Sequence, residues 1–162
     1  MADIVSREKR SQMMSGIRGT NTKPEILIRK ALHAEGFRFR LHDTRLPGKP
    51  DLFLPKYRAV IMVQGCFWHG HDCNLFKWPK TRTDFWQKKI GSNRMRDTLV
   101  RKELDDLGWR VAEIWECALK GRTRHPFEEL IGAVTSWLKS DNPYACFTGN
   151  NRERVGSGIG TH

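Results

Sequence analysis

Residues 65–73 bring together several side chains that can bind a metal. Four of them are ligands of transition metals: Cys66, His69, His71 and Cys73. Cys117, which follows a later apolar stretch, adds a further thiol. Three cysteines and one histidine can complete the tetrahedral shell of a structural zinc ion. The spacing does not choose between His69 and His71, and unrelated free thiols remain the alternative. We therefore expect Zn²⁺ to tie residues 65–82 to the stretch that ends at Cys117.

Oxygen ligands for a harder cation come from another part of the chain. Asp51 follows Pro50 at a turn into an apolar run, and the next apolar run ends at Gln64. An aspartate that starts one strand and faces its neighbour can bind Mg²⁺. Mg²⁺ at this position would stabilise charge on a phosphate and activate water. The alternative is a solvated aspartate in a turn.

Two more residues are candidates for acid–base chemistry. If His69 is not a zinc ligand, its imidazole can serve as a general base near neutral pH. Glu25 has a carboxylate that could orient such a histidine or a metal-bound water. The alternative for Glu25 is a capping role at the start of a helix.

Aromatic residues alternate with basic ones between residues 67 and 88. The aromatic members are Phe67, Trp68, Phe76, Trp78 and Trp86, and the basic members are Lys77, Lys80, Arg82 and Lys88. Such a mixture suits stacking on bases or wedging between them. The alternative is a small aromatic core that covers the zinc site.

The composition favours a nucleic acid as the partner. The chain has 162 residues, of which 29 are Lys or Arg and 18 are Asp or Glu, so its formal net charge is +11. The alternatives are a solvated basic surface or contact with anionic membranes. No apolar run approaches the roughly 20 residues of a membrane span, and the charged start does not resemble a signal peptide. We expect a cytoplasmic protein, in which cysteines are metal ligands or free thiols.

These residues need a scaffold, which the periodicity predicts to be mixed α/β. A helix begins at Thr22 with a capping box and ends at Gly36. Strands are expected over residues 37–41, 51–54, 57–64 and 109–116, the second and third forming a hairpin. A helix over residues 83–107 is capped by Thr83 and Asp84 and weakened at Gly91 and Ser92. A last helix starts at Pro126. A small mixed sheet with helices on both faces fits this order.

The domain organisation follows from the same pattern. Residues 1–20 are expected to form a basic arm or short helix, and residues 21–140 a single domain. Residues 141–162 lack periodicity and are rich in Gly, Asn and Ser, so we expect a disordered tail. Cys146 falls in that tail and is assigned no role.

Six motifs together closely resemble the very short patch repair (Vsr) mismatch endonucleases. They are Thr-Lys-Pro-Glu (22–25), Leu-Pro-Gly-Lys-Pro-Asp (46–51), Gly-Cys-Phe-Trp-His-Gly-His-Asp-Cys (65–73), Thr-Arg-Thr-Asp-Phe-Trp (81–86), Leu-Gly-Trp-Arg-Val (107–111) and Ile-Trp-Glu-Cys-Ala-Leu (114–119). The resemblance extends over residues 6–140. It implies a restriction-endonuclease-like fold of the PD-(D/E)xK type. It also implies nicking of duplex DNA 5′ to the thymine of T·G mismatches that arise when 5-methylcytosine deaminates.

The resemblance also implies roles for individual residues. Asp51 and the backbone carbonyl of Val63 bind Mg²⁺, His69 acts with the attacking water, and Glu25 supports that site. The structural zinc is held by Cys66, His71, Cys73 and Cys117, which selects His71 over His69. Phe67, Trp68 and Trp86 intercalate beside the mismatch. Further DNA contacts are expected from Arg45, Lys49, Lys88 and Lys89.

One pair departs from the family pattern. Well-known members have Thr-His immediately before Gly-Cys-Phe-Trp-His, whereas this chain has Val63 and Gln64. A backbone carbonyl is available from valine as well as from threonine, but glutamine cannot exchange a proton near neutral pH. Gln64 can still hydrogen-bond a phosphate or a water, so we expect activity at a reduced rate.

Three functions are consistent with these residues. The first is a Mg²⁺-dependent mismatch endonuclease that acts as a monomer on duplex DNA, with a mismatch-repair protein such as MutL as a candidate partner. The second is a zinc-stabilised protein that binds distorted DNA without cutting it, which the substitution at Gln64 keeps open. The third is a nuclease of the same fold with another target sequence.

Overall fold

The computed structural model describes residues 21–150, so the predicted arm over residues 1–20 and residues 151–162 lie outside the described part. Its helices are α2 (Lys23–Ala34), α3 (Thr83–Asp106) and α4 (Phe127–Lys139). Its strands are β1 (Arg40–Leu41), β2 (Leu52–Leu54), β3 (Ala59–Gln64), β4 (Arg110–Trp115) and β5 (Tyr144–Phe147). Two 3-10 turns, η1 (Pro55–Tyr57) and η2 (Glu116–Ala118), complete the elements.

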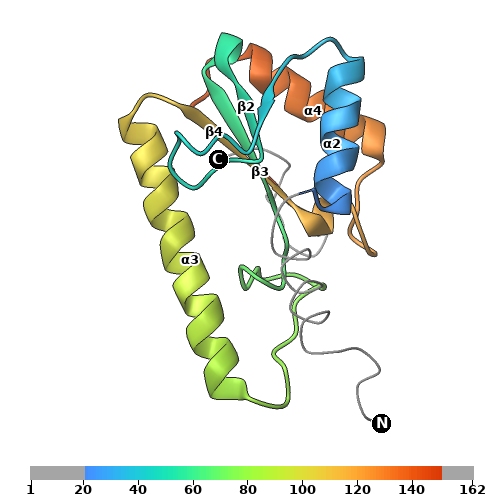
Figure 1. Ribbon diagram of the computed structural model, residues 1–162. Coiled ribbons are helices and arrows are strands. Elements are labelled where there is room, and N and C mark those ends of the chain that lie inside the picture. Colours follow the sequence, from blue (N-terminus) through green and yellow to red (C-terminus); the bar gives the residue numbers. More distant parts are fainter. Residues whose placement is uncertain (1–20, 151–162) are drawn as a thin grey trace.

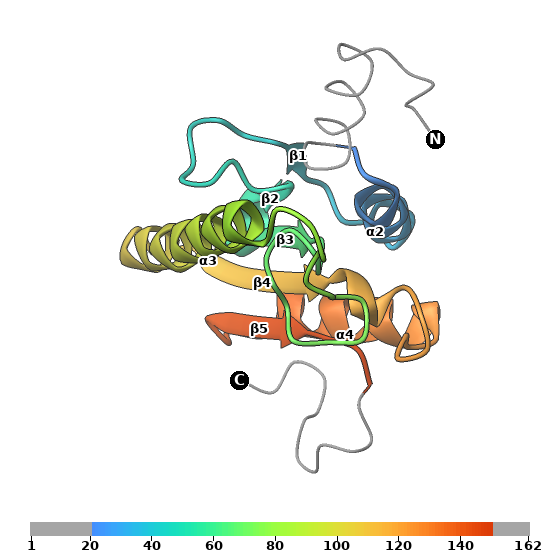
Figure 2. The same cartoon turned by 90° about the horizontal axis from the view of Figure 1, so that it is seen from below.

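The five strands form one mixed sheet in the order β1-β2-β3-β4-β5. β1, β2 and β3 are antiparallel neighbours, which confirms the predicted hairpin, and β3, β4 and β5 are parallel. Figures 1 and 2 show α2 and α4 on one face of the sheet and α3 on the other. The expected mixed sheet with helices on both faces is therefore confirmed.

Alternation along the strands divides the core between the two faces. Leu52 and Leu54 join the large cluster under α2 and α4, whereas Phe53, between them, packs with Leu104 of α3. Phe37 also enters the large cluster, where its ring lies 5.4 Å from that of Tyr57. Because Phe37 packs inward, β1 is shorter than the predicted strand over residues 37–41.

The start of α2 confirms the predicted cap in a modified form. The Thr22 side chain accepts a hydrogen bond from the Glu25 N–H at 3.4 Å. The Glu25 carboxylate reaches back to the N–H of Asn21, at 3.1 Å, instead of that of Thr22. Gly36, at φ +96°, follows the helix end as expected.

The structure confirms the predicted helix α3 but corrects its expected cap. The helix is continuous through Gly91 and Ser92, and its first residue follows Arg82, which has a left-handed backbone and makes no side-chain cap. Neither Thr83 nor Asp84 is the cap, because both already lie inside the helix. Ile90, just before the weak point, is buried next to Gly70 of the loop after β3, and Leu104, beyond it, packs against the sheet. Tertiary packing on both sides therefore stabilises the helix across the weak point.

The predicted disorder from residue 141 onward is wrong for the described part of that tail. Residues 144–147 form β5, which pairs in parallel with Val111–Ile114 of β4. Ala145 and Phe147 are buried, and Cys146 therefore lies in a strand of the sheet. Although β5 has only four residues, hydrogen bonding to β4 and burial of one of its faces stabilise it. Among residues 21–150, no helix is long and apolar enough to cross a membrane.

Candidate active site and metal centre

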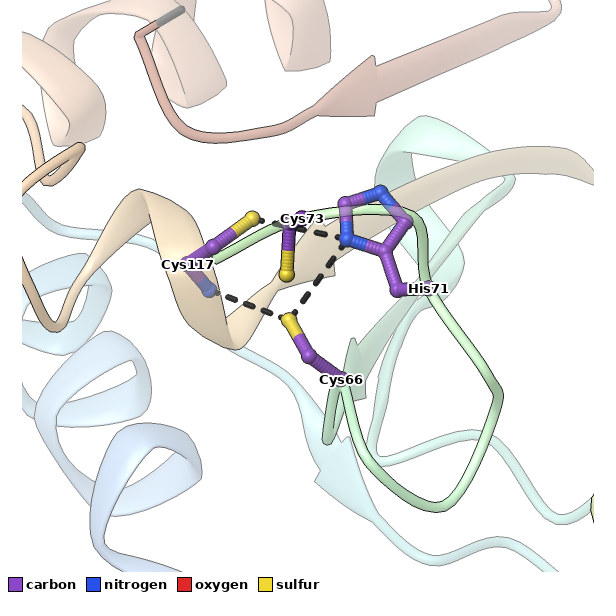
Figure 3. A group of neighbouring side chains, drawn as sticks. All are labelled: Cys66, His71, Cys73 and Cys117. Carbon is purple, nitrogen blue, oxygen red and sulfur yellow. Dashed lines mark hydrogen bonds between the residues drawn. The ribbon is translucent and has the colours of Figure 1, made fainter. Parts of the chain in front are cut away.

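The parallel pairing of β3 with β4 brings two of the predicted zinc ligands together. Gln64 is in register with Trp115. Cys66 and Cys117 each lie two residues beyond this pair, so both follow the same edge of the sheet. Both are buried. The loop that starts at residue 65 then turns back and brings His71 and Cys73 to the same place (Figure 3).

The four ligand atoms are close enough to share one metal ion. They all lie within 4.8 Å of one another. Nδ1 of His71 is 3.6 Å from the sulfur of Cys66 and 3.5 Å from that of Cys117. One face of the His71 imidazole stacks on Trp115, with ring centroids 4.1 Å apart. His69 is not in this cluster, so the geometry brings together the set that contains His71.

The surroundings of the sulfurs suit thiolates. Each sulfur accepts a backbone N–H: Cys66 from Cys117 at 3.3 Å, Cys73 from Leu75 at 3.4 Å, and Cys117 from Gly149 at 3.2 Å. The contact with Cys66, together with His71, lowers the pKa of Cys117 to about 4. The same sulfur contact and burial raise the pKa of Cys66. A bound cation would allow all three thiols to ionise, so this donor set fits Zn²⁺.

The predicted carboxylates form a second cluster on the other side of β3. Glu25, His42 and Asp51 offer ligand atoms within 4.8 Å of one another. Asp51 Oδ2 accepts the Val63 N–H at 2.7 Å. Glu25 is only 1% exposed, although it carries a carboxylate. The helix start and the beginning of β2 thus place two carboxylates side by side in a poorly hydrated site.

This crowding changes the ionisation of Asp51. Burial raises the pKa of Asp51 to about 7, and the Glu25 carboxylate adds to the increase. The hydrogen bond from Val63 opposes it. A divalent cation would remove the repulsion between the two carboxylates, so the donor set fits a hard oxygen-binding ion such as Mg²⁺.

A cavity of about 770 Å³ connects Asp51 with two other residues of the predicted catalytic set, whereas Glu25 is buried behind Asp51 and does not line it. Val63, Gln64 and His69 line the same cavity. Nδ1 of His69 contacts Oδ2 of Asp97 on α3. Because the carboxylate only accepts hydrogen bonds, Nδ1 carries the proton and Nε2 is left as the basic nitrogen. The arrangement can therefore accept a proton next to a site for a divalent cation.

The aromatic residues form one cluster at the mouth of this cavity. The ring centroid of Phe67 lies 5.2 Å from that of Trp68 and 5.2 Å from that of Trp86. Phe76 also contacts Phe67, so the cluster joins the loop to the start of α3. Phe67 and Trp68 line the cavity, and none of these four rings is fully buried. The cluster therefore combines internal packing with surface that remains accessible.

The predicted DNA-contacting cations are in different environments. Lys49 and Lys89 line the cavity, whereas Lys88 is exposed outside its lining. Arg45 is not part of the lining. Its guanidinium forms two hydrogen bonds with Asp43, at 3.0 and 2.7 Å.

Several residues of the cavity and its carboxylate cluster had no predicted role, among them three polar residues of α3 and one histidine. These four are His42, Asn93, Arg96 and Asp97. The three on α3 recur at spacings of three and four, which places them on one helix face. That signal was present, but the sequence did not show that this face is directed at the cavity. His42 sits in an irregular loop where no periodicity marks it.

Comparison with known proteins agrees with the geometry. Residues 2–75 match a family model described as DNA mismatch endonuclease Vsr. The chain is 44% identical over 138 residues to the DNA mismatch endonuclease Vsr of Escherichia coli, covering 85% of this chain and 88% of that protein. It is 48% identical over 119 residues to the type II nicking enzyme V.XorIIP of Xanthomonas oryzae, covering 74% of this chain and 88% of the relative. It is also 48% identical over 122 residues to the type II nicking enzyme V.NmeAIP of Neisseria meningitidis, with coverage of 75% and 87%. The chain therefore belongs to the Vsr family of DNA endonucleases.

Proposed function

We propose that this protein nicks duplex DNA 5′ to the thymine of a T·G mismatch and does so with Mg²⁺. The observation that carries the proposal is the cavity that Asp51, Gln64 and His69 line together. Its restriction-endonuclease-like character rests on the β2–β3 hairpin, which presents Asp51 at the start of β2. The E. coli relative, whose name describes a mismatch endonuclease, supports the choice of substrate.

The residues of the site have separate roles in the proposed reaction. Asp51, Glu25 and the backbone carbonyl of Val63 would hold the cation. Bound Mg²⁺ would stabilise the charge on the scissile phosphate and make its water more acidic. His69 accepts the proton of the attacking water at Nε2, while Asp97 holds the ring at Nδ1. Gln64 donates a hydrogen bond to the phosphate or the water.

Mismatch selection is assigned to the aromatic cluster. Phe67, Trp68 and Trp86 enter the duplex beside the mispair, and each unstacked step costs a few kcal/mol. A mispaired step resists unstacking less than a matched step, so the same wedge favours T·G over T·A. Lys49, Lys89 and Arg96 contact phosphates along the cavity. Cys66, His71, Cys73 and Cys117 would hold Zn²⁺, which would fix the loop that carries Phe67 and Trp68.

The experiment compares labelled duplexes that contain T·G or T·A in one CTWGG-type context, with Mg²⁺ and with EDTA. The proposal predicts a Mg²⁺-dependent nick 5′ to the mispaired thymine, absent in Asp51→Asn. Cutting of the matched duplex at a fixed sequence would instead indicate a nuclease with another target. Binding without a nick, in this context and in randomised flanks, would indicate a protein that recognises distorted DNA without cutting it. The substitution at Gln64 leaves that alternative open.

A further inference from the structure

His42 makes a direct contact with the carboxylate cluster. Its Nε2 lies 2.8 Å from Oε2 of Glu25. The His42 side chain is 15% exposed and that of Glu25 is 1% exposed, so little water competes for this hydrogen bond. An ionised carboxylate can only accept hydrogen bonds, so Nε2 of His42 carries a proton and donates a hydrogen bond to Glu25.

The other contacts of Glu25 explain why this hydrogen bond matters. Arg29 donates to the same oxygen, Oε2, at 2.9 Å, and the N–H of Asn21 donates to Oε1 at 3.1 Å. Arg29 is four residues further along α2, and its side chain is 21% exposed. Its ion pair with Glu25 therefore lies within the helix and does not connect Glu25 to another element. His42 comes from a different segment, immediately after β1, and provides the tertiary contact to this carboxylate.

The position of His42 is itself set by the cluster. Its backbone has a left-handed conformation, with φ +51°, and its N–H donates to the carbonyl of Asp51 at 3.2 Å. The backbone of His42 is therefore tied to Asp51, and its side chain is tied to Glu25. One residue thus links the backbone of Asp51 to the carboxylate of Glu25.

We propose that His42 is a positioning residue, which holds the Glu25 carboxylate in the orientation where it and Asp51 share one divalent cation. This inference rests on the proposed function in one respect, that Glu25 and Asp51 hold the cation. Partners that orient metal ligands commonly change metal affinity by ten- to a hundredfold when they are removed. His42 acts through Glu25 and not on the DNA.

The test measures Mn²⁺ binding to the full-length protein by electron paramagnetic resonance of the free ion. Thiolates prefer softer metals, so Mn²⁺ reports on the carboxylate cluster and not on the cysteine cluster. His42→Leu removes the donor at similar volume, and His42→Gln restores a neutral N–H donor. His33→Leu is the matched control, because His33 is an exposed histidine of α2.

The proposal predicts that His42→Leu weakens Mn²⁺ binding by roughly tenfold or more. His42→Gln and His33→Leu stay within about threefold of the parent protein, well below the tenfold loss. In a Glu25→Gln background, His42→Leu has no further effect, because the group through which it acts is gone. Retained Mn²⁺ affinity in His42→Leu, or an equal and additive loss in the Glu25→Gln background, would overturn the proposal.

Two further results separate this inference from the proposed function. If Mn²⁺ binding follows the predicted pattern but no T·G duplex is nicked, the positioning role stands and the assigned reaction fails. If the parent protein nicks the T·G duplex but His42→Leu binds Mn²⁺ normally, the reaction stands and the role of His42 fails. A loss in His42→Gln as large as that in His42→Leu would also overturn it, since an N–H donor would then be insufficient.

Discussion

His69 of the loop after β3 is hydrogen-bonded through Nδ1 to Asp97, which lies in the middle of α3. The two residues are 28 positions apart in the sequence and come from different elements. The contact fixes the imidazole against the helix and directs Nε2 away from Asp97. It therefore determines which nitrogen of His69 can act as a base.

We expect Asp97→Asn to slow nicking by roughly 10²- to 10⁴-fold, because an amide oxygen in place of the carboxylate no longer stabilises the imidazolium. Single-turnover rates on the T·G duplex at saturating enzyme measure this effect. DNA affinity should stay within about twofold of the parent protein, far below the expected change in rate. Asp105→Asn, an exposed aspartate on the same helix, is the control. Equal rates for the two variants would contradict the role of Asp97.

The cysteine cluster predicts a dependence of folding on one metal ion. Cys117→Ala should remove one of four ligands, release the metal and lower the free energy of unfolding by on the order of 5 kcal/mol. Metal analysis of the purified protein and thermal denaturation measure the two effects. Cys146→Ala is the matched control, because this cysteine lies in β5 and outside the four-residue cluster. About one equivalent of zinc retained by Cys117→Ala would disprove the four-ligand assignment.

The raised pKa of Asp51 predicts an unusual effect of pH on the stability of the protein when no Mg²⁺ is present. The pKa of Asp51 rises from 3.8 to about 7 in the folded state, so between these values the folded state binds more protons than the unfolded state. The free energy of unfolding therefore falls as pH rises from about 4 to 7, because Asp51 loses its proton in the folded state over this range. A shift of about three pKa units corresponds to a loss on the order of 4 kcal/mol. Urea denaturation of the Zn²⁺-loaded protein, in buffer without Mg²⁺ and without a chelator, measures this loss across the same range of pH.

Two controls isolate the contribution of Asp51. Asp51→Asn cannot ionise, so its stability should change less over the same range of pH. Addition of Mg²⁺ at pH 7 should restore stability to the parent protein but not to Asp51→Asn, because only the carboxylate gains from the cation. Identical pH profiles for parent and variant would show that Asp51 is not the group responsible.

More of the cysteine–histidine cluster than of the candidate active site could be predicted from the sequence. Cys66 and Cys117 each follow an apolar strand, and strong ligands near strand ends are visible without a structure. Asp97 and His42 carry no such signal, since their partners are distant in the sequence. β5 was missed because four residues give too few alternations, although Ala145 and Phe147 occupy its buried face. What could not be predicted thus depended on tertiary contacts.

Gln64 should limit the rate rather than prevent the reaction. It is buried, with 7% of its surface exposed, and it lines the cavity with His69. An imidazole at this position could exchange a proton near neutral pH, which an amide cannot do. We expect Gln64→His to accelerate nicking by roughly tenfold or more, with a new limb in the pH–rate profile. Gln64→Asn is the control, and no gain in Gln64→His over the parent would show that proton exchange here is not limiting.

Lys89 and Arg96 should contribute DNA affinity without sequence preference. Both line the cavity from α3, whereas Arg45 is paired with Asp43 outside it. If both cations contact phosphates, Lys89→Ala and Arg96→Ala should each reduce the slope of log K against log salt by about one. Arg45→Ala is the charge-matched control and should change the slope less, because the Asp43 carboxylate already neutralises this guanidinium. Titrations of T·G and T·A duplexes at several salt concentrations measure the slopes. A larger effect of Arg45→Ala would indicate that DNA displaces Asp43 and follows a path outside the cavity.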